Sequence, residues 1–233
     1  MSDKRYVVVG GSAGIGLALV QSLSEAGHQV VVLSRSKDSL SGLANVQHYQ
    51  CDVLSDEINM EWFGDSVHGL AYCPGTVNLK PIRSLSPELF REDFELNVVS
   101  AVKVIQAALK PLKASRKASI LLFSTVAVAQ GISFHASIAA SKGAIEGLTR
   151  SLAAELAPHI RVNCLAPSLT ETSLTKRFVA DEKKQDAANK RHPLGRFGQP
   201  SDFAEIGKLL LTSDSSWISG QVIGVDGGLS TLR

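Results

Sequence analysis

The sequence predicts an α/β protein with one doubly wound, mostly parallel sheet of about seven strands and helices on both faces. Apolar runs of strand length alternate with segments of helical periodicity from one end of the chain to the other. The strand-length runs are continuous in Val, Ile and Leu, which is typical of strands buried on both faces. At 233 residues the chain is long enough for one such domain. We expect residues 1–233 to form a single unit.

Seven segments have the length and composition of buried strands. The first follows a polar lead and ends at a glycine cluster, and the second is the run QVVVLS. The repeated β-α-β order then makes neighbouring strands parallel, because each connection crosses a face of the sheet. The expected strands are 5–10, 29–34, 46–51, 69–73, 119–124, 160–165 and 221–225.

Helical periodicity fills most of the intervals between these strands. A glycine-rich turn precedes the first helix, and Pro158 is expected to end the third. Only about 20 residues separate Asp52 from Tyr72, so the helix between the third and fourth strands should be short or irregular. The expected helices are 14–26, 87–112, 137–157 and 201–211.

Residues 168–198 form the one long stretch without a predicted strand. The segment is polar, and we expect it to be mobile and to cover a site. Its basic part, residues 183–191, is interleaved with Asp186 and alanines, which favours a solvated helix face. The side chains that would shape a partly apolar pocket are Leu169, Leu174, Phe178 and Phe197.

Composition and charge exclude several classes of function. A formal net charge of +2 gives no indication of a nucleic-acid or anionic-membrane partner. No apolar stretch approaches membrane-spanning length, and the first apolar run is too short for a signal peptide, so a cytoplasmic location is expected. Cys51, Cys73 and Cys164 are far apart and lie in or beside apolar segments. They are interpreted as buried free thiols, with no metal site.

The turn after the first strand, VVVGGSAGIG, indicates dinucleotide binding. Glycines at this point allow a sharp turn and a close approach to a pyrophosphate, which the first turn of the following helix stabilises with free N–H groups. Such a turn is the mark of a Rossmann-type fold when it joins a first strand to a first helix. The predicted cofactor-binding residues here are Gly10, Ser12, Gly14, Ile15 and Gly16.

The end of the second strand indicates NADP(H) rather than NAD(H). About 20 residues after the glycines, where an acidic side chain would bind the ribose 2′-hydroxyl of NAD, the chain has Ser34 and Arg35, followed by Ser36 and Lys37. A guanidinium beside hydroxyl groups suits a 2′-phosphate, which a carboxylate would repel. The alternative is that Arg35 is simply solvated.

These features resemble the short-chain dehydrogenase/reductase family over nearly the whole chain. Gly10, Gly14 and Gly16 match its glycine pattern, and Val9 stands where the family often has Thr. The C-terminal stretches HPLGRFGQPSDFAE and ISGQVIGVDGG are similar to its most recognisable segments. The resemblance implies a nicotinamide-dependent oxidoreductase, and it implies a homodimer or homotetramer.

The resemblance also implies roles for further residues. Asp52 and Val53 resemble the adenine-contacting pair, and Gly75 is what remains of the family's Asn-Asn-Ala-Gly in YCPG. Residues 166–172, APSLTET, look like the Pro-Gly segment. In it Pro167 is retained, Ser168 replaces Gly, and Thr172 is placed to meet the cofactor.

The catalytic set implied by the family is incomplete in this chain. Asn97, in ELNVVSA, occupies the asparagine position. The family spacing of Ser, twelve residues, Tyr, three residues and Lys places Thr125 at the serine, Ile138 at the tyrosine and Lys142 at the lysine. Isoleucine has no proton to exchange with a substrate oxygen. The lysine in such enzymes lowers the tyrosine pKa and holds the cofactor ribose.

A substitute proton donor is therefore needed. His135 stands three residues before Ile138, although a surface or capping histidine is the simpler interpretation. Ser137 is a poor acid and is interpreted as a helix N-cap. Tyr72 is expected on the ribose or adenine side, too far to serve. Lys142, acting through water with a pKa lowered by burial, is the favoured donor.

Two functions remain open at this stage. The first is an NADP(H)-dependent oxidoreductase acting on a carbonyl or alcohol with an altered proton relay. The second is a non-catalytic NADP(H)-binding sensor or partner subunit, for which Ile138 would be a packing residue. The presence of both Asn97 and Lys142 favours the first. The substrate cannot be predicted from the sequence.

Overall fold

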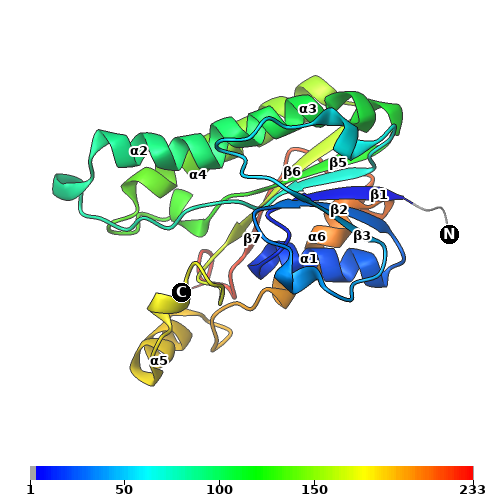
Figure 1. Cartoon of the computed structure of the whole chain (residues 1–233). Coiled ribbons are helices and arrows are strands. Elements are labelled where there is room, and N and C mark those ends of the chain that lie inside the picture. The colour runs from blue at the N-terminus through cyan, green and yellow to red at the C-terminus, as the bar shows by residue number, and fades with distance from the viewer. Residues whose placement is uncertain (1–3, 233) are drawn as a thin grey trace.

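The computed structural model describes residues 4–232 and confirms the predicted fold class (Figure 1). Seven strands form one sheet in the order β3-β2-β1-β4-β5-β6-β7, and every neighbouring pair is parallel. The strands are β1 Arg5–Val9, β2 Gln29–Ser34, β3 Val46–Gln50, β4 Gly69–Tyr72, β5 Ala118–Phe123, β6 Ile160–Pro167 and β7 Val222–Val225.

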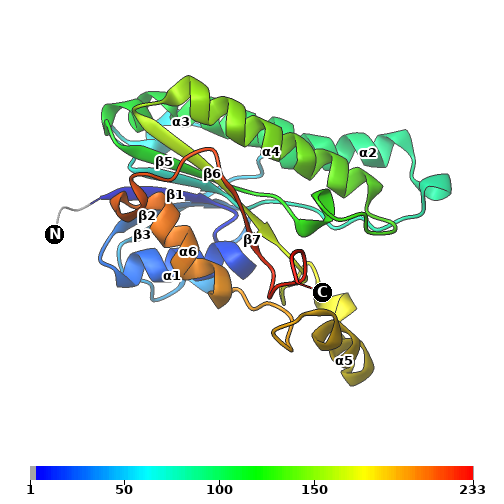
Figure 2. The ribbon, with the colours of Figure 1, turned by 180° about the vertical axis from the view of Figure 1, so that it is seen from behind.

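Helices cover both faces of the sheet. Figures 1 and 2 show α2, α3 and α4 on one face and α1 and α6 on the other, while α5 lies apart, near the C-terminal end of the chain. No helix within residues 4–232 is long and apolar enough to cross a membrane. The helices are α1 Gly14–Glu25, α2 Pro87–Phe94, α3 Ser100–Ala114, α4 Ala136–Leu156, α5 Glu182–Arg191 and α6 Ser201–Leu211.

The two faces of the sheet produce two apolar cores. Side chains alternate along each strand, so Val7 and Val9 of β1 belong to the core beneath α3 and α4, whereas Tyr6 and Val8 belong to the core beneath α1 and α6. Both cores are closed to water: the four side chains are at most 1% exposed. This double burial explains why the strands read as continuous apolar runs.

The strand order places a crevice at the carboxyl ends of β1 and β4. The chain runs outward from β1 to β2 and β3, then returns to the other side of β1 with β4. In open α/β sheets, the loops at such a reversal diverge and leave a crevice in which ligands bind. The glycine turn, the YCPG segment and the loops after β5 and β6 all leave the sheet at this edge.

The predicted helix at 87–112 is interrupted by one wide turn. Ser86 caps α2 by accepting a hydrogen bond from the Leu89 amide, as its position before Pro87 favours. Residues Glu95–Val99 then form a π-helical turn before α3 continues. Such turns are frequently found at functional sites, and this one contains Asn97, which is fully buried.

Of two smaller predictions, one is confirmed in full and the other in part. The interval between β3 and β4 contains no α-helix among the described residues and only a single 3-10 turn, Met60–Phe63. The three cysteines are free thiols as predicted; Cys51 and Cys164 are buried, whereas Cys73 is half-buried, contrary to the prediction.

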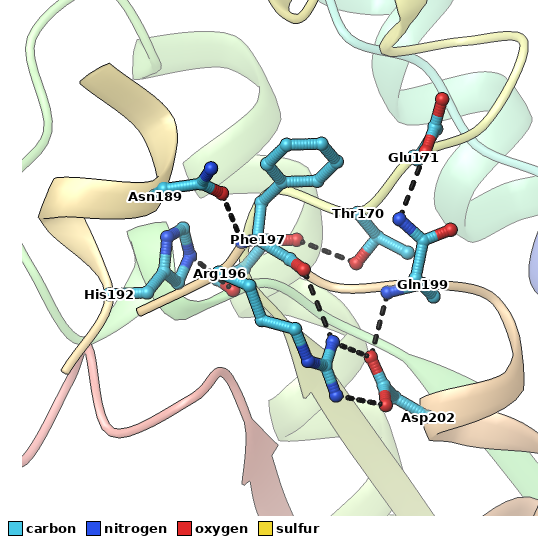
Figure 3. Close-up of polar contacts among 9 residues, drawn as sticks. Thr170, Glu171, Asn189, His192, Arg196, Phe197, Gln199 and Asp202 are labelled. Carbon is cyan, nitrogen blue, oxygen red and sulfur yellow. Dashed lines mark hydrogen bonds and ion pairs between the residues drawn. The ribbon is translucent and has the colours of Figure 1, made fainter. Parts of the chain in front are cut away.

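Residues 168–198 contain α5 and are joined at their base. The Glu171 amide donates to the Gly198 carbonyl at 2.8 Å, and the Gly198 amide donates to the Leu169 carbonyl at 2.9 Å, which makes a parallel bridge between Thr170 and Gly198. Figure 3 shows the polar contacts around this base, including the pairing of Arg196 with Asp202. The two ends of the segment are therefore held together by this bridge. The mobility of the residues between them stays a prediction.

Candidate active site

A cavity of about 750 Å³ lies at the carboxyl ends of the strands. Its walls come from the glycine turn after β1, the loops after β2 to β6, the first half of α4 and residues 167–192. One continuous space therefore joins the predicted cofactor residues to the predicted catalytic ones.

The glycine turn has the geometry that only glycine allows. Gly10 and Gly14 have φ angles of 73° and 53°, and a Cβ at Gly16 would lie 2.3 Å from the Gly10 carbonyl oxygen. Helix α1 begins at Gly14 with no side-chain cap and no acidic residue in its first turn. Its first N–H groups are therefore available to an anion. The five residues predicted here to bind the cofactor, Gly10, Ser12, Gly14, Ile15 and Gly16, line the cavity.

The predicted ribose and adenine residues line the same end of the cavity. Ser34 and Arg35 leave β2, and Asp52 and Val53 follow β3. The Ser34 hydroxyl donates to the Ser36 carbonyl at 2.8 Å, so it serves the local turn. Arg35 is exposed, and within residues 4–232 no hydrogen bond or ion pair holds its guanidinium. It is free to bind an anionic group.

The opposite end of the cavity contains Thr125, Ile138 and Lys142. Thr125 follows β5, and its hydroxyl caps the next turn by accepting from the Ala127 amide at 3.3 Å. The neighbouring Ser124 donates to the Glu146 carboxylate at 2.7 Å. Both residues line the cavity, but the Ser124 hydroxyl is already engaged with Glu146, and Thr125 is the residue predicted at the serine position.

Lys142 has an unusual environment. Its side chain is buried, and burial lowers the pKa of its amine to about 8. The nearby thiols of Cys73 and Cys164 cannot neutralise it at pH 7, because burial raises the pKa of each to about 12. Within residues 4–232, the Nζ atom forms no hydrogen bond or ion pair, and the side chain lines the cavity. A buried amine close to neutrality is typical of a functional lysine.

Asn97 lies behind the cavity wall rather than in it. Its side-chain amide donates to the Thr76 hydroxyl at 3.1 Å and to the Asp93 carbonyl at 2.7 Å, while its Oδ1 is buried without a partner. A methyl group added to Gly75 would lie 3.2 Å from Asn97 Oδ1 and 3.3 Å from Lys142 Nζ. Gly75 thus lies between an unpaired acceptor and an unpaired donor, and a side chain there would press against both.

Segment 167–172 closes the cavity above the glycine turn. Pro167 ends β6 and Thr172 follows five residues later, and both of these predicted cofactor residues line the cavity. A Cβ at Gly14 would lie 3.0 Å from the Thr172 methyl group. The two segments are therefore packed directly against each other.

Three expectations about individual side chains are wrong. Ser137 is not an N-cap: α4 begins one residue earlier, and the hydroxyl donates to the buried Asp93 carboxylate at 2.5 Å. Tyr72 does not face the cofactor side, because β4 directs it into the core, where its hydroxyl donates to the Leu96 carbonyl. Phe197 does not line the cavity, since its amide is tied to the Asn189 side chain.

His135 does line the cavity. It is half-buried at the entrance of α4, and its Nδ1 lies 2.8 Å from the Ser133 carbonyl oxygen. It remains a candidate donor.

Several residues at the substrate end were not predicted. Lys184 and Arg191 line the cavity from α5, so the basic stretch is not only a solvated face. Ser168 and His192 line it as well, with Ser168 Oγ 2.9 Å from His192 Nε2. The only sequence signal for this pair was the serine that replaces glycine at position 168.

Comparisons with known proteins agree with this geometry. A family model described as enoyl-(acyl carrier protein) reductase matches residues 9–230. The chain is 34% identical to a tropinone reductase homolog of Arabidopsis thaliana, over 99% of this chain and 93% of that protein. It is 32% identical to the 3-oxoacyl-(acyl-carrier-protein) reductase MabA of Mycobacterium bovis, over 97% and 93%. The ligand-free aldohexose dehydrogenase of Thermoplasma acidophilum has a TM-score of 0.88 at 29% identity, over 99% and 95%.

Proposed function

This chain belongs to the short-chain dehydrogenase/reductase family of nicotinamide-dependent oxidoreductases, and from that premise we propose that it reduces a carbonyl compound with NADPH. One observation carries the proposal. A single cavity joins the glycine turn after β1, with the unpaired Arg35 at one end, to the buried Lys142 at the other. The relatives compared above are named as reductases and a dehydrogenase of this kind.

The residues present fit a dinucleotide with a 2′-phosphate. The first amides of α1, beyond Gly14, would bind the pyrophosphate, and Arg35 would pair with the 2′-phosphate. Asp52 and Val53 would contact the adenine, and Lys142 would hold the nicotinamide ribose. When bound, NADPH supplies the hydride.

The rest of the reaction falls to the chain's own side chains. The Thr125 hydroxyl would orient the carbonyl oxygen, and the Lys142 charge would stabilise the negative charge that develops there. Ile138 contributes only apolar contact. General acid catalysis is typically worth about 10²–10⁴-fold, so loss of the tyrosine lowers the rate without abolishing hydride transfer. Lys142 acting through water, with a pKa of about 8, is the proton source that the sequence favours.

The charges of the cavity favour an acidic substrate. Among residues 4–232, four cationic side chains line it, Arg35, Lys142, Lys184 and Arg191, against one carboxylate, Asp52. Arg35 and Asp52 lie at the nucleotide end. At the substrate end, Lys184 is paired with Asp181 at 3.3 Å, whereas Arg191 has no ion pair or hydrogen bond within the described chain. A carbonyl compound that also carries a carboxylate would satisfy Arg191.

Fluorescence titration with NADPH and NADH tests the cofactor proposal. We expect tighter binding of NADPH and a loss of that preference in Arg35→Ala, because a charge-assisted contact to the 2′-phosphate is removed. Lys37→Ala is the matched control, since Lys37 does not line the cavity. Equal binding of both cofactors, or none, would remove the NADPH proposal.

Turnover is then measured with a panel of neutral and acidic carbonyl compounds. Cofactor oxidation by the wild-type chain supports the reductase. The alternative, a non-catalytic NADP(H)-binding sensor or partner subunit, is favoured by the presence of Ile138 in the cavity. It predicts NADPH binding without turnover, and no gain of turnover in Ile138→Tyr.

A further inference from the structure

Ser168 and His192 form a hydrogen-bonded pair in the cavity wall. Ser168 follows directly after β6, and His192 follows directly after α5. Their Oγ and Nε2 atoms are 2.9 Å apart. Both residues line the cavity, and His192 is only 4% exposed, so its ring has little contact with bulk water. Neither Ser168 nor His192 belongs to the predicted catalytic set, so the proposed reaction has so far given this contact no role.

The other ring nitrogen of His192 determines the direction of this hydrogen bond. Nδ1 lies 2.7 Å from the Ala188 carbonyl oxygen, which can only accept. Nδ1 must therefore carry a proton, and in the neutral ring Nε2 is the acceptor. Ser168 then donates its proton to Nε2. When the ring is protonated, Nε2 donates to the Ser168 oxygen. The Ser168 hydroxyl keeps its own hydrogen and can then donate it to a group in the cavity.

The fold places this hydroxyl beside the catalytic end of the cavity. β5 and β6 are parallel neighbours, with Phe123 opposite Leu165. Thr125 lies two residues past the end of β5, and Ser168 lies one residue past the end of β6. Neighbouring strands are about 4.8 Å apart. The two hydroxyl residues therefore leave the sheet side by side, at the edge where Ile138 offers no proton.

The segment that carries His192 is anchored on several sides. Figure 3 shows Arg196 paired with both oxygens of Asp202, each at 2.7 Å. The Asn189 side chain accepts from the Phe197 amide at 3.2 Å, and the Leu194 amide donates to the Gly227 carbonyl. These contacts hold His192 against Ser168 before any substrate binds, which is what a proton-transfer pair requires.

We propose that Ser168 and His192 supply the proton that the missing tyrosine would have supplied. The proposal rests on the reductase function. As the hydride that NADPH supplies bonds to the carbonyl carbon, the carbonyl oxygen takes the Ser168 hydroxyl proton and the product is an alcohol. Ser168 takes the Nε2 proton of protonated His192, which leaves the neutral ring to be reprotonated from solvent. Lys142 then acts through its charge, and not as the donor.

A first experiment needs no substrate. NMR of the wild-type chain with ¹⁵N-labelled histidine, with His192 assigned by its loss in His192→Gln, reports which ring nitrogen carries the proton. We expect the Nδ1–H tautomer in the neutral ring. We also expect the Nε2 resonance to shift in Ser168→Ala. An Nε2–H tautomer would overturn the proposal, because Ser168 could not then donate to the ring.

A second experiment measures kcat for NADPH oxidation with the best substrate of the carbonyl panel. We expect Ser168→Ala and His192→Gln each to lose about 100-fold, within the range of a lost general acid. Ser168→Thr, which keeps a hydroxyl, should recover most of the rate. The controls are Ser173→Ala, a cavity-lining serine, and His159→Gln, a histidine outside the cavity. The dissociation constant of NADPH should stay within twofold in all of these variants.

The pH profile separates a proton-transfer role from a structural one. The charged groups around His192 are Asp226, which follows β7 and interacts with the ring electrostatically, and Arg191 and Lys184 of α5, which line the same cavity. All three are kept in His192→Gln. This variant should change the pH profile of kcat and still keep the fall near pH 8 that deprotonation of Lys142 produces. An unchanged profile would overturn the proposal.

The failure of this inference differs from the failure of the proposed function. If the wild-type chain turns over and both Ser168→Ala and His192→Gln stay within threefold of it, the pair is structural and the reductase stands. If the chain binds NADPH but neither it nor Ile138→Tyr turns over any carbonyl compound, the reductase itself is wrong and the pair has no reaction to serve.

Discussion

Ile138 and Lys142 lie one helical turn apart on α4, and both side chains line the same cavity. The first is apolar and 4% exposed, and the second is a buried amine whose pKa burial lowers to about 8. Residues four apart on a helix are neighbours on its surface. A ligand that reaches Lys142 therefore also contacts the methyl groups of Ile138. The pair therefore gives the site a positive charge from Lys142 and an apolar surface from Ile138, which cannot donate a proton.

Replacement of Ile138 by tyrosine should raise kcat for carbonyl reduction. The new phenol would lie one turn from Lys142, whose positive charge lowers its pKa and makes it a better acid. The gain is bounded by the usual 10²–10⁴-fold value of general acid catalysis. Ile138→Phe is the matched control, because it adds the ring without the hydroxyl. An equal gain in both variants would show that ring packing, and not proton transfer, limits the rate.

Lys142→Met should increase the free energy of unfolding at pH 7. Burial lowers the pKa of Lys142 from 10.5 to about 8, so between these pH values the unfolded chain binds one more proton than the folded chain. Stability therefore rises with pH across this window. Below pH 8 the buried charge costs about 3 kcal/mol, which methionine would recover while losing NADPH affinity.

Urea denaturation of both proteins at pH 7 and pH 10 checks this prediction. Buried thiols and tyrosines titrate in both proteins, so the difference between the two isolates Lys142. A difference that does not shrink toward pH 10 would show that the amine is not destabilised by burial.

Arg191→Ala should raise KM for acidic carbonyl compounds at least tenfold and leave KM for neutral ones nearly unchanged. Arg191 lines the substrate end of the cavity without an ion pair among the described residues, so a substrate carboxylate is its natural partner. Lys190→Ala is the control, because Lys190 is paired with Asp186 and lies outside the cavity. Equal effects on acidic and neutral substrates would contradict the proposed substrate class.

Asp93→Ala should lower the free energy of unfolding by about 3 kcal/mol. The Asp93 carboxylate is fully buried and accepts hydrogen bonds from the Asn78 side chain at 2.7 Å and the Ser137 hydroxyl at 2.5 Å. Alanine would leave the buried Ser137 hydroxyl and the half-buried Asn78 amide without this acceptor. Glu92→Ala, one residue away and exposed, should change stability by less than about 0.5 kcal/mol. Urea denaturation measures both, and similar values would show that the buried contacts contribute little.

Gly16→Ala should abolish NADPH binding and destabilise the fold. Its Cβ would lie 2.3 Å from the Gly10 carbonyl oxygen, a contact that only a shift of the whole turn relieves. Gly147→Ala is the opposite case, because a Cβ there meets open space on α4. That variant should gain about 0.5–1 kcal/mol through helix propensity. Thermal unfolding and NADPH titration of the pair measure both effects, and NADPH binding by Gly16→Ala would contradict the first.

The sheet and the nucleotide end of the site were predictable because their signals are local. A strand buried on both faces must be continuously apolar, and the run QVVVLS shows this without reference to any other segment. The glycine turn is likewise contained in seven residues, and Gly16 is dictated by contact with Gly10. Arg35 could be placed because its distance from that turn is set by one helix and one strand.

The substrate end depends on contacts between distant residues, and these leave no pattern in the sequence. Ser168 meets His192 only because residues 172–191 fold back over the cavity. Ser137 reads as a helix cap until Asp93, 44 residues earlier, is packed against it. The wide turn that buries Asn97 interrupts a stretch whose periodicity predicts one unbroken helix. In each case tertiary packing overrides a correct local preference.

The bridge between Thr170 and Gly198 joins the two ends of residues 171–197. This insert leaves the sheet and returns to it at that bridge, so its ends stay together whatever contacts it makes between them, such as that of Leu194 with Gly227. The entropy of closing such an insert grows only with the logarithm of its length, at about 0.6 kcal/mol per doubling. Its length and composition can therefore change by recombination or design without disturbing the sheet. The nucleotide end has no such freedom, because it is assembled from several strand ends at once. Substrate selectivity can thus change through exchange of this insert, while the strand ends that form the nucleotide end of the cavity stay the same.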